Sequence, residues 1–161
     1  MALQREAEFD PIQVLVQLAD AGVEFVVIGS VAGAAHGSAY STDDTDLAYD
    51  NRSGSVKPLA AALGRLGLAP NSASMIGRGN LTFETAFGKL DVLDDPAGAP
   101  SYEKLRAGAT EILVAGRCFR IASLDHLIAM AEAMGRTKDK LLASEYRVIS
   151  DLLRAPADEE S

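Results

Sequence analysis

Two short stretches in the first third of the chain carry side chains suited to binding phosphate and metal ions. Gly29-Ser30 ends an apolar run, and Asp44-Thr45-Asp46 follows, with thirteen residues between Ser30 and Asp44. Glycine lets a backbone approach a phosphate closely, and a serine hydroxyl adds a hydrogen bond. A helix beginning near Ser30 would also direct free N–H groups at that phosphate. Gly29 and Ser30 are therefore predicted to bind a phosphorylated ligand.

The aspartates are spaced for metal binding. Side chains two residues apart on a strand share a face, so Asp44 and Asp46 lie together and Thr45 points to the other face. Asp91 interrupts an otherwise apolar stretch (90–93), where an inward-facing charge requires a partner. Carboxylates and substrate phosphates are the usual ligands of Mg²⁺. We expect Asp44, Asp46 and Asp91 to be catalytic and to bind Mg²⁺ (or Mn²⁺), in a site able to hold two ions.

Each of these motifs has a simpler interpretation when taken alone. A glycine-serine pair after a strand is usually only a turn, and an Asp-x-Asp pair is usually a solvated strand edge. Their combination with a third aspartate on a later strand favours a functional site. Together they predict chemistry on a nucleoside triphosphate.

Composition limits the class of protein. The chain has 161 residues, of which 48% are hydrophobic, enough for the core of a single domain. We expect that domain to span residues 1–154, with a core at about 11–121, a C-terminal helical segment at 122–154 and a disordered tail at 155–161. No apolar run approaches the roughly 20 residues of a membrane span, and the first residues do not resemble a secretory signal. A single cysteine, Cys118, fits a cytoplasmic protein and is predicted to be a packed thiol.

The net charge of −8 argues against binding nucleic acid by bulk attraction. Two interpretations remain open for the bases in the last third of the chain: a local basic face for an anionic substrate, or scattered solvated charges. These bases are Arg117, Arg120, Arg136, Lys138, Lys140 and Arg147.

Hydrophobic periodicity and turn residues predict alternating helices and strands. The expected fold class is α/β (α+β): a small mixed β-sheet flanked by helices, with a C-terminal helical segment. Helices are expected at 11–21, 30–36, 56–66 and 123–134, followed by a last helix that Thr137 caps, and residues 101–106 are expected to form a helical turn. Strands are expected at 23–28, 42–50, 81–87, 89–93, 111–115 and 117–121.

Through Gly29-Ser30, Asp44-x-Asp46 and the later Asp91, the sequence resembles the nucleotidyltransferase superfamily typified by DNA polymerase beta. The stretches 35–37, 41–47, 121–130 and 135–139 further resemble the minimal nucleotidyltransferases of the AbiEii and MenT toxin type. The resemblance spans roughly residues 11 to 153. It implies a sheet of nucleotidyltransferase type.

The resemblance also implies roles for single residues. Asp44, Asp46 and Asp91 would bind the metal ions, Gly29 and Ser30 the triphosphate. Lys138 would contact phosphate and Arg136 would lie near the nucleotide or the acceptor. An acceptor hydroxyl would attack the α-phosphorus of the NTP as pyrophosphate departs. Asp91 or a metal-bound hydroxide would help to remove the acceptor proton.

By the same resemblance, the chain is expected to be the toxin of a toxin–antitoxin pair that adds nucleotides to the 3′ end of tRNA, with a cognate antitoxin protein as partner. Two alternatives stay open. The acceptor is a partner protein, or the chain is a catalytically weakened partner-binding module. Three positions depart from the family pattern: Tyr40 and Ala131 replace common basic residues, and Thr45 replaces an apolar one.

Two histidines lie near these motifs. His36 is expected either to interact with the last carbonyls of its helix or to line the acceptor pocket. His126 is expected to be structural or on the surface.

Overall fold

The structure is a computed structural model, and it describes residues 8–40, 42–50, 56–68 and 80–155. The helices are α1 (Pro11–Asp20), α2 (Gly29–Ala35), α3 (Val56–Arg65), α4 (Tyr102–Ala107), α5 (Leu124–Met134) and α6 (Thr137–Arg154). The strands are β1 (Phe25–Ile28), β2 (Asp44–Tyr49), β3 (Leu81–Thr85), β4 (Gly88–Leu93), β5 (Thr110–Val114) and β6 (Arg117–Ile121). Except for the tail, where only residue 155 is described, the predicted elements lie within the described ranges.

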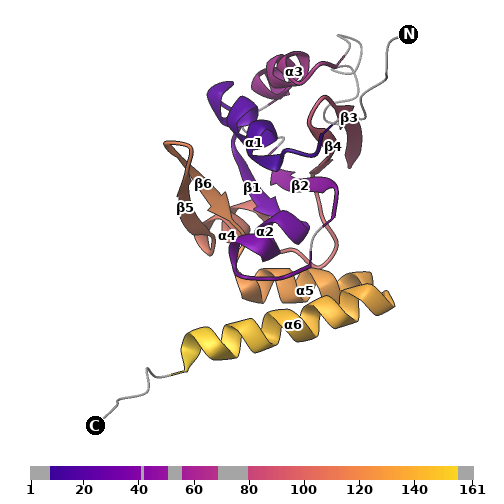
Figure 1. The fold of residues 1–161 in the computed structure, drawn as a ribbon, viewed down its shortest axis with the longest axis vertical. Helices are drawn as coiled ribbons and strands as arrows, with labels where there is room; N and C mark the ends of the chain where they lie inside the picture. The colour runs from indigo at the N-terminus through magenta and orange to yellow at the C-terminus, as the bar shows by residue number, and fades with distance from the viewer. Residues whose placement is uncertain (1–7, 41, 51–55, 69–79, 156–161) are drawn as a thin grey trace.

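The strands form one mixed sheet in the order β3-β4-β2-β1-β6-β5. β1 runs parallel to β6 and β2 parallel to β4, whereas the other neighbours are antiparallel. The expected fold class, a mixed sheet with flanking helices and a C-terminal helical segment, is confirmed. Figure 1 shows α1 and α3 together at one end of the molecule, and α5 and α6 stacked at the other.

Alternation along the neighbouring strands β2 and β4 separates an apolar face of the sheet from a polar one. On β2 and β4, Thr45, Leu47, Leu90 and Val92 are buried, and they belong to the side of the core that α1 and α3 complete. The residues between them point to the opposite face, as the two-residue period of a strand requires. The carboxylates of Asp44, Asp46 and Asp91 therefore share the polar face.

Most helix ends follow from local sequence. Asp10 caps α1 by accepting a hydrogen bond from the Gln13 amide, and Ser123 caps α5 by accepting one from the His126 amide. Gly135 ends α5 in the left-handed conformation, with φ of 69°. The prediction that Thr137 caps the last helix was wrong. Thr137 is the first helical residue of α6, because the Asp139 carboxylate accepts the Arg136 amide and thereby fixes the helix start one residue earlier.

Two predictions about side chains near β6 and α6 also need correction or refinement. Cys118 is exposed, so the packed-thiol prediction was wrong: Phe119 and Ile121 take the buried face of β6, which turns Cys118 outward.

The bases of the last third do not form a free basic face. Four of the six are paired with acids, in the ion pairs Arg117–Asp20, Arg120–Glu111, Arg136–Asp139 and Arg147–Glu132.

None of the described helices combines the length and the apolar character needed to cross a bilayer.

Candidate active site

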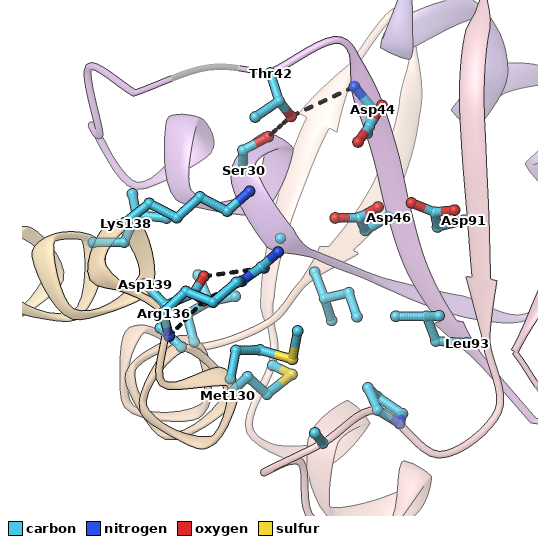
Figure 2. Close-up of a pocket in the computed structure, with 18 of the residues that line it drawn as sticks. Ser30, Thr42, Asp44, Asp46, Asp91, Leu93, Met130, Arg136, Lys138 and Asp139 are labelled. Atoms are coloured by element: carbon cyan, nitrogen blue, oxygen red, sulfur yellow. Dashed lines mark hydrogen bonds and ion pairs between the residues drawn. The ribbon is translucent and has the colours of Figure 1, made fainter. Parts of the chain in front are cut away.

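The three aspartates meet because of strand register. In the parallel pair of β2 and β4, Asp46 is directly opposite Asp91, and Asp44 is opposite Lys89. Neighbouring side chains on one face of a sheet lie about 5 Å apart, so register alone brings Asp46 and Asp91 together. Asp44 is two residues before Asp46 on the same face. Figure 2 shows the three carboxylates gathered at one side of a cavity.

Gly29 makes room for this group of carboxylates. It lies at the junction of β1 and α2 with φ of +67°, a left-handed conformation that favours glycine. A Cβ at this position would overlap Asp46 Oδ2. The absence of a side chain at Gly29 is therefore what allows the Asp46 carboxylate to sit against the backbone of the turn.

Asp46 is held in an unfavourable electrostatic environment. Burial raises the pKa of its carboxyl to about 7, and the neighbouring carboxyls of Asp91 and Asp44 act in the same direction, while Lys89 lowers it. One of its oxygens, Oδ1, is buried without a hydrogen-bond partner in the part of the chain that is described. Asp91 is better supported, because Thr82 Oγ1 on β3 donates a hydrogen bond to its Oδ1 at 2.5 Å.

A chain of hydroxyl groups links the turn at Gly29 to the first aspartate. Ser30 Oγ lies 2.7 Å from Thr42 Oγ1, which also accepts a hydrogen bond from the Asp44 amide at 3.4 Å (Figure 2). The Ser30 hydroxyl is thus held at the cavity wall, beside the start of β2. The sequence did not single out Thr42, because its role depends on the path of the chain between α2 and β2.

The opposite wall carries two cations from the start of α6. The side chains of Arg136 and Lys138 extend from this helix toward the carboxylates (Figure 2). Arg136 Nε donates to Asp139 Oδ2 at 2.6 Å, and this ion pair holds the pKa of the nearly buried Asp139 carboxyl below its usual range. Lys138 has no ion pair within the described ranges, so its charge is available to a ligand.

Three polar contacts fasten the end of α2 and the segment that follows it to the last third of the chain. His36 Nε2 lies 2.7 Å from the Ala122 carbonyl oxygen. The Glu145 carboxylate on α6 accepts hydrogen bonds from Ser38 Oγ and from the Ala39 amide, at 3.1 and 3.0 Å. His36 therefore binds a carbonyl far along the chain rather than those at the end of its own helix. These contacts fix the position of Tyr40, which lines the cavity.

All seven residues that the sequence predicted for the site line one cavity of about 500 Å³. This volume is within the usual range for small-molecule sites. Sequence reasoning missed Lys89, although its position two residues before Asp91 on a strand already implied a shared face. It also missed an apolar part of the wall, which includes Leu93, Pro96, Leu127, Met130 and Met134. Those residues come from distant segments, so no local pattern marks them.

The carboxylates suit a divalent cation in the chemistry of their donor atoms. A buried carboxylate oxygen without a donor, such as Asp46 Oδ1, is a hard ligand of the kind that Mg²⁺ prefers. Among the described residues, however, no group of three or more His, Cys, Asp or Glu side chains is arranged as a finished metal site. Binding an ion would thus require these side chains to rotate toward it.

Comparison with protein-family models gives no match, and no curated protein matches the sequence. Among solved structures, the chain is similar to TM1012 from Thermotoga maritima, whose assignment as a nucleotidyltransferase is provisional. The identity is 13%, the match covers 91% of this chain and 99% of that one, and the TM-score is 0.57.

Two structures of the antibiotic-resistance factor ANT(2″)-Ia are also similar. The solution structure matches with 16% identity over 88% of this chain and 94% of that chain, with a TM-score of 0.47. The crystal structure with adenylyl-2″-tobramycin matches with 14% identity over 85% and 94%, with a TM-score of 0.44. These two likenesses are too weak to carry an argument. The likeness to TM1012 shows a common fold.

Proposed function

We propose that this chain is a nucleotidyltransferase that moves a nucleoside monophosphate from an NTP to an acceptor hydroxyl, with Mg²⁺ or Mn²⁺ as cofactor. The observation that carries the proposal is the cavity itself. Three carboxylates on the sheet face two cations at the start of α6, Arg136 at its N-cap and Lys138 in its first turn, across a space of about 500 Å³. A triphosphate with its cation needs both signs of charge within one cavity.

In this proposal each wall has its own role. Asp44, Asp46 and Asp91 hold the divalent cation, which supplies positive charge to the reacting phosphate when bound. Ser30 and the backbone at Gly29 hold the triphosphate, with Lys138 on its far side. Arg136 lies near the nucleotide or the acceptor.

The reaction balances without a further reactant. The acceptor oxygen forms a bond to the α-phosphorus, and the bond from that phosphorus to the bridging oxygen of the β-phosphate breaks. Pyrophosphate leaves with that electron pair. The proton of the acceptor hydroxyl passes to the carboxylates of the sheet, with Asp91 as the first candidate, because Thr82 engages only one of its oxygens.

The finer part of the proposal concerns the acceptor and the biological role. Sequence resemblance supports the 3′ end of tRNA as acceptor, a toxin role, a cognate antitoxin partner and a cytoplasmic location. The exposed Cys118, which has no cysteine partner, is compatible with a reducing compartment.

The test is transfer of label from α-³²P-labelled NTPs. Purified protein with Mg²⁺ or Mn²⁺ is expected to label total tRNA, and Asp46→Asn is expected to lower the rate by about 10²- to 10³-fold or more, the scale of removing one preorganised charged group. Asp43→Asn, an exposed neighbour outside the cavity, is the matched control and should keep full activity.

Each other outcome has a defined meaning. Label on a co-expressed protein instead of tRNA would replace the acceptor and keep the chemistry. Absence of transfer together with absence of NTP binding in calorimetry would contradict the proposal and favour a partner-binding module.

A further inference from the structure

The outer face of α6 carries an exposed apolar stripe. Leu141, Val148 and Leu152 are 67%, 58% and 70% exposed. They lie 7 and 4 residues apart, and at 3.6 residues per turn these spacings place them on one face of the helix. The opposite face, with Ala143, Tyr146 and Ser150, is buried. Figure 1 shows α6 as the outermost layer of the molecule, with α5 between it and the rest.

Most charged side chains of α6 already have a role within the chain. Arg147 and Arg154 pair with Glu132 and Asp125 of α5. Asp139 binds Arg136, Glu145 binds the Ser38 segment, and Lys138 lines the cavity.

Two charges of opposite sign are left over. The side chains of Lys140 and Asp151 have no hydrogen bond or ion pair within ranges 8–40, 42–50, 56–68 and 80–155. Both lie on the same flank of the apolar stripe, one near each of its ends. The stripe and these two charges together are called the α6 outer face below.

The spacing of these residues is self-complementary. Lys140 and Asp151 are separated by 11 positions, and so are Leu141 and Leu152. Eleven residues make slightly more than three full helical turns, about 16 Å. If a second α6 lies antiparallel on the first, a two-fold axis at residue 146 brings Lys140 and Asp151, and likewise Leu141 and Leu152, to within one residue, about 1.5 Å along the helix, of directly opposite positions. In an isologous interface each of these pairs occurs twice.

We propose that the α6 outer face binds a second copy of this chain, giving an antiparallel two-fold dimer. Val148 lies near the axis, and the leucines cover the two ends of the stripe. A contact made by one helix from each copy is smaller than a standard protein interface, so the dimer is weak and its population depends on concentration. The inner residues Asp139, Leu142 and Tyr146 line the cavity from the other side of α6, so the dimer does not depend on the proposed enzymatic activity.

Sedimentation velocity of the full chain over a range of concentrations tests the dimer. The expected mass rises toward twice 16.9 kDa as concentration increases. Leu152→Ser is expected to raise the dissociation constant of the dimer by roughly tenfold or more, because it removes a leucine from both ends of the interface. Leu153→Ser is the matched control. Leu153 is adjacent and equally exposed at 68%, but it points about 100° away around the helix and should leave the mass unchanged.

Charge reversal tests the orientation of the two helices. Lys140→Asp and Asp151→Lys alone each place like charges opposite one another twice, and each is expected to shift the equilibrium to monomer. The double variant Lys140→Asp with Asp151→Lys restores opposite charges and is expected to recover the dimer. Circular dichroism of each variant checks that α6 remains folded.

Three results would overturn the proposal. A monomer at every concentration would mean that a different protein covers the stripe, or that the stripe stays in solvent. A dimer insensitive to Leu152→Ser would place the interface elsewhere. Loss of the dimer in both single charge variants without recovery in the double variant would exclude the antiparallel pairing.

Discussion

The two walls of the cavity are built from different kinds of structure. The carboxylates of Asp46 and Asp91 lie on adjacent strands inside the sheet, so backbone pairing on both sides of β2 fixes their separation. Arg136 and Lys138 are long side chains at the start of a helix, and the Arg136 side chain is 55% exposed. The acidic wall is therefore set by backbone, whereas the basic wall is set by side-chain contacts.

This difference determines where each wall is vulnerable. Strand pairing fixes the backbone positions of the aspartates, so repulsion among the carboxylates can be relieved only by rotation of these short side chains. The cations can move with rotamer changes that cost little. We therefore expect the acidic wall to be most sensitive to substitutions at the backbone turn that it packs against. Substitutions of Arg136 and Lys138 should instead show that one cation stabilises the fold and the other binds the ligand.

Among the substitutions that test this comparison of the two walls, the largest effect is expected from Gly29→Ala. The added methyl group overlaps the Asp46 carboxylate, so nucleotide transfer should fall by about 10²-fold or more, as for loss of a preorganised charged group. Gly22→Ala is the matched control, because Gly22 also has a left-handed φ, +84°, but has open space around it. Both variants carry the strain of about 1–2 kcal/mol for a left-handed side chain. Equal activity of the two variants would show that the approach to Asp46 is unimportant.

The second comparison separates the two cations. Arg136→Gln leaves the nearly buried Asp139 carboxylate without its ion pair, so the free energy of unfolding should fall by about 1–3 kcal/mol. Lys138→Gln should leave stability unchanged and weaken NTP binding by about tenfold, a change of roughly 1.4 kcal/mol. Urea unfolding and calorimetry measure these effects. The double variant Arg136→Gln with Asp139→Asn should regain stability; if it does not, Arg136 stabilises the fold by other contacts.

The third prediction concerns pH. The pKa of Asp46 is about 7 in the folded chain against an ordinary value of 3.8, so between these values the folded state binds more protons than the unfolded state. The free energy of unfolding should then decrease as pH rises from about 4 to about 7, by linkage. Asp46→Asn should remove this contribution and stabilise the metal-free protein at pH 8 by about 1–3 kcal/mol.

The control for this pH effect is Asp43→Asn, which should keep the pH dependence of the unmodified chain. Mg²⁺ should stabilise the unmodified chain at pH 8 and have little effect on Asp46→Asn. A parallel pH dependence of unmodified and Asp46→Asn protein, measured by chemical unfolding, would contradict the electrostatic account of this carboxylate.

The smallest effect is expected from a substitution of Thr45, the residue between Asp44 and Asp46 on β2. Thr45 is fully buried, and its hydroxyl has no hydrogen-bond partner in the described part of the chain. Thr45→Val replaces this hydroxyl by a methyl group of similar size, so the free energy of unfolding should rise by about 1 kcal/mol with activity unchanged. A loss of stability in thermal or urea unfolding would indicate that the hydroxyl has a partner.

The parts of the site that sequence predicted depend on local periodicity. The two-residue period of a strand was enough to place Asp44 and Asp46 on one face and Thr45 on the other. Apolar flanks were enough to identify Asp91 as an unusual charge within a strand. The fold class followed from the same patterns, because helix and strand periods differ and glycines mark most of the boundaries.

The parts that sequence did not predict depend on pairing between distant segments. Thr82 reaches Asp91 only through the register of β3 and β4, and Glu145 reaches Ser38 across 107 positions of the chain. The Cys118 prediction failed for a related reason: a strand pattern shows which residues alternate, but not which face is covered. The start of α6 was misplaced because Asp139 and Arg136 compete with Thr137 for that position.

The polar contacts that join the connection between α2 and β2 to the last third of the chain have a consequence for partial unfolding. The segment that carries Tyr40 is fixed by Glu145 on α6 and by the bond from His36 to Ala122, whereas β2 and β4 are paired along most of their length. Release of the C-terminal helix pair would thus dismantle the cavity while the strands stay hydrogen-bonded. Ligand binding would then be lost when the C-terminal helices unfold locally, whereas amide exchange in β2 would report the free energy of unfolding of the sheet.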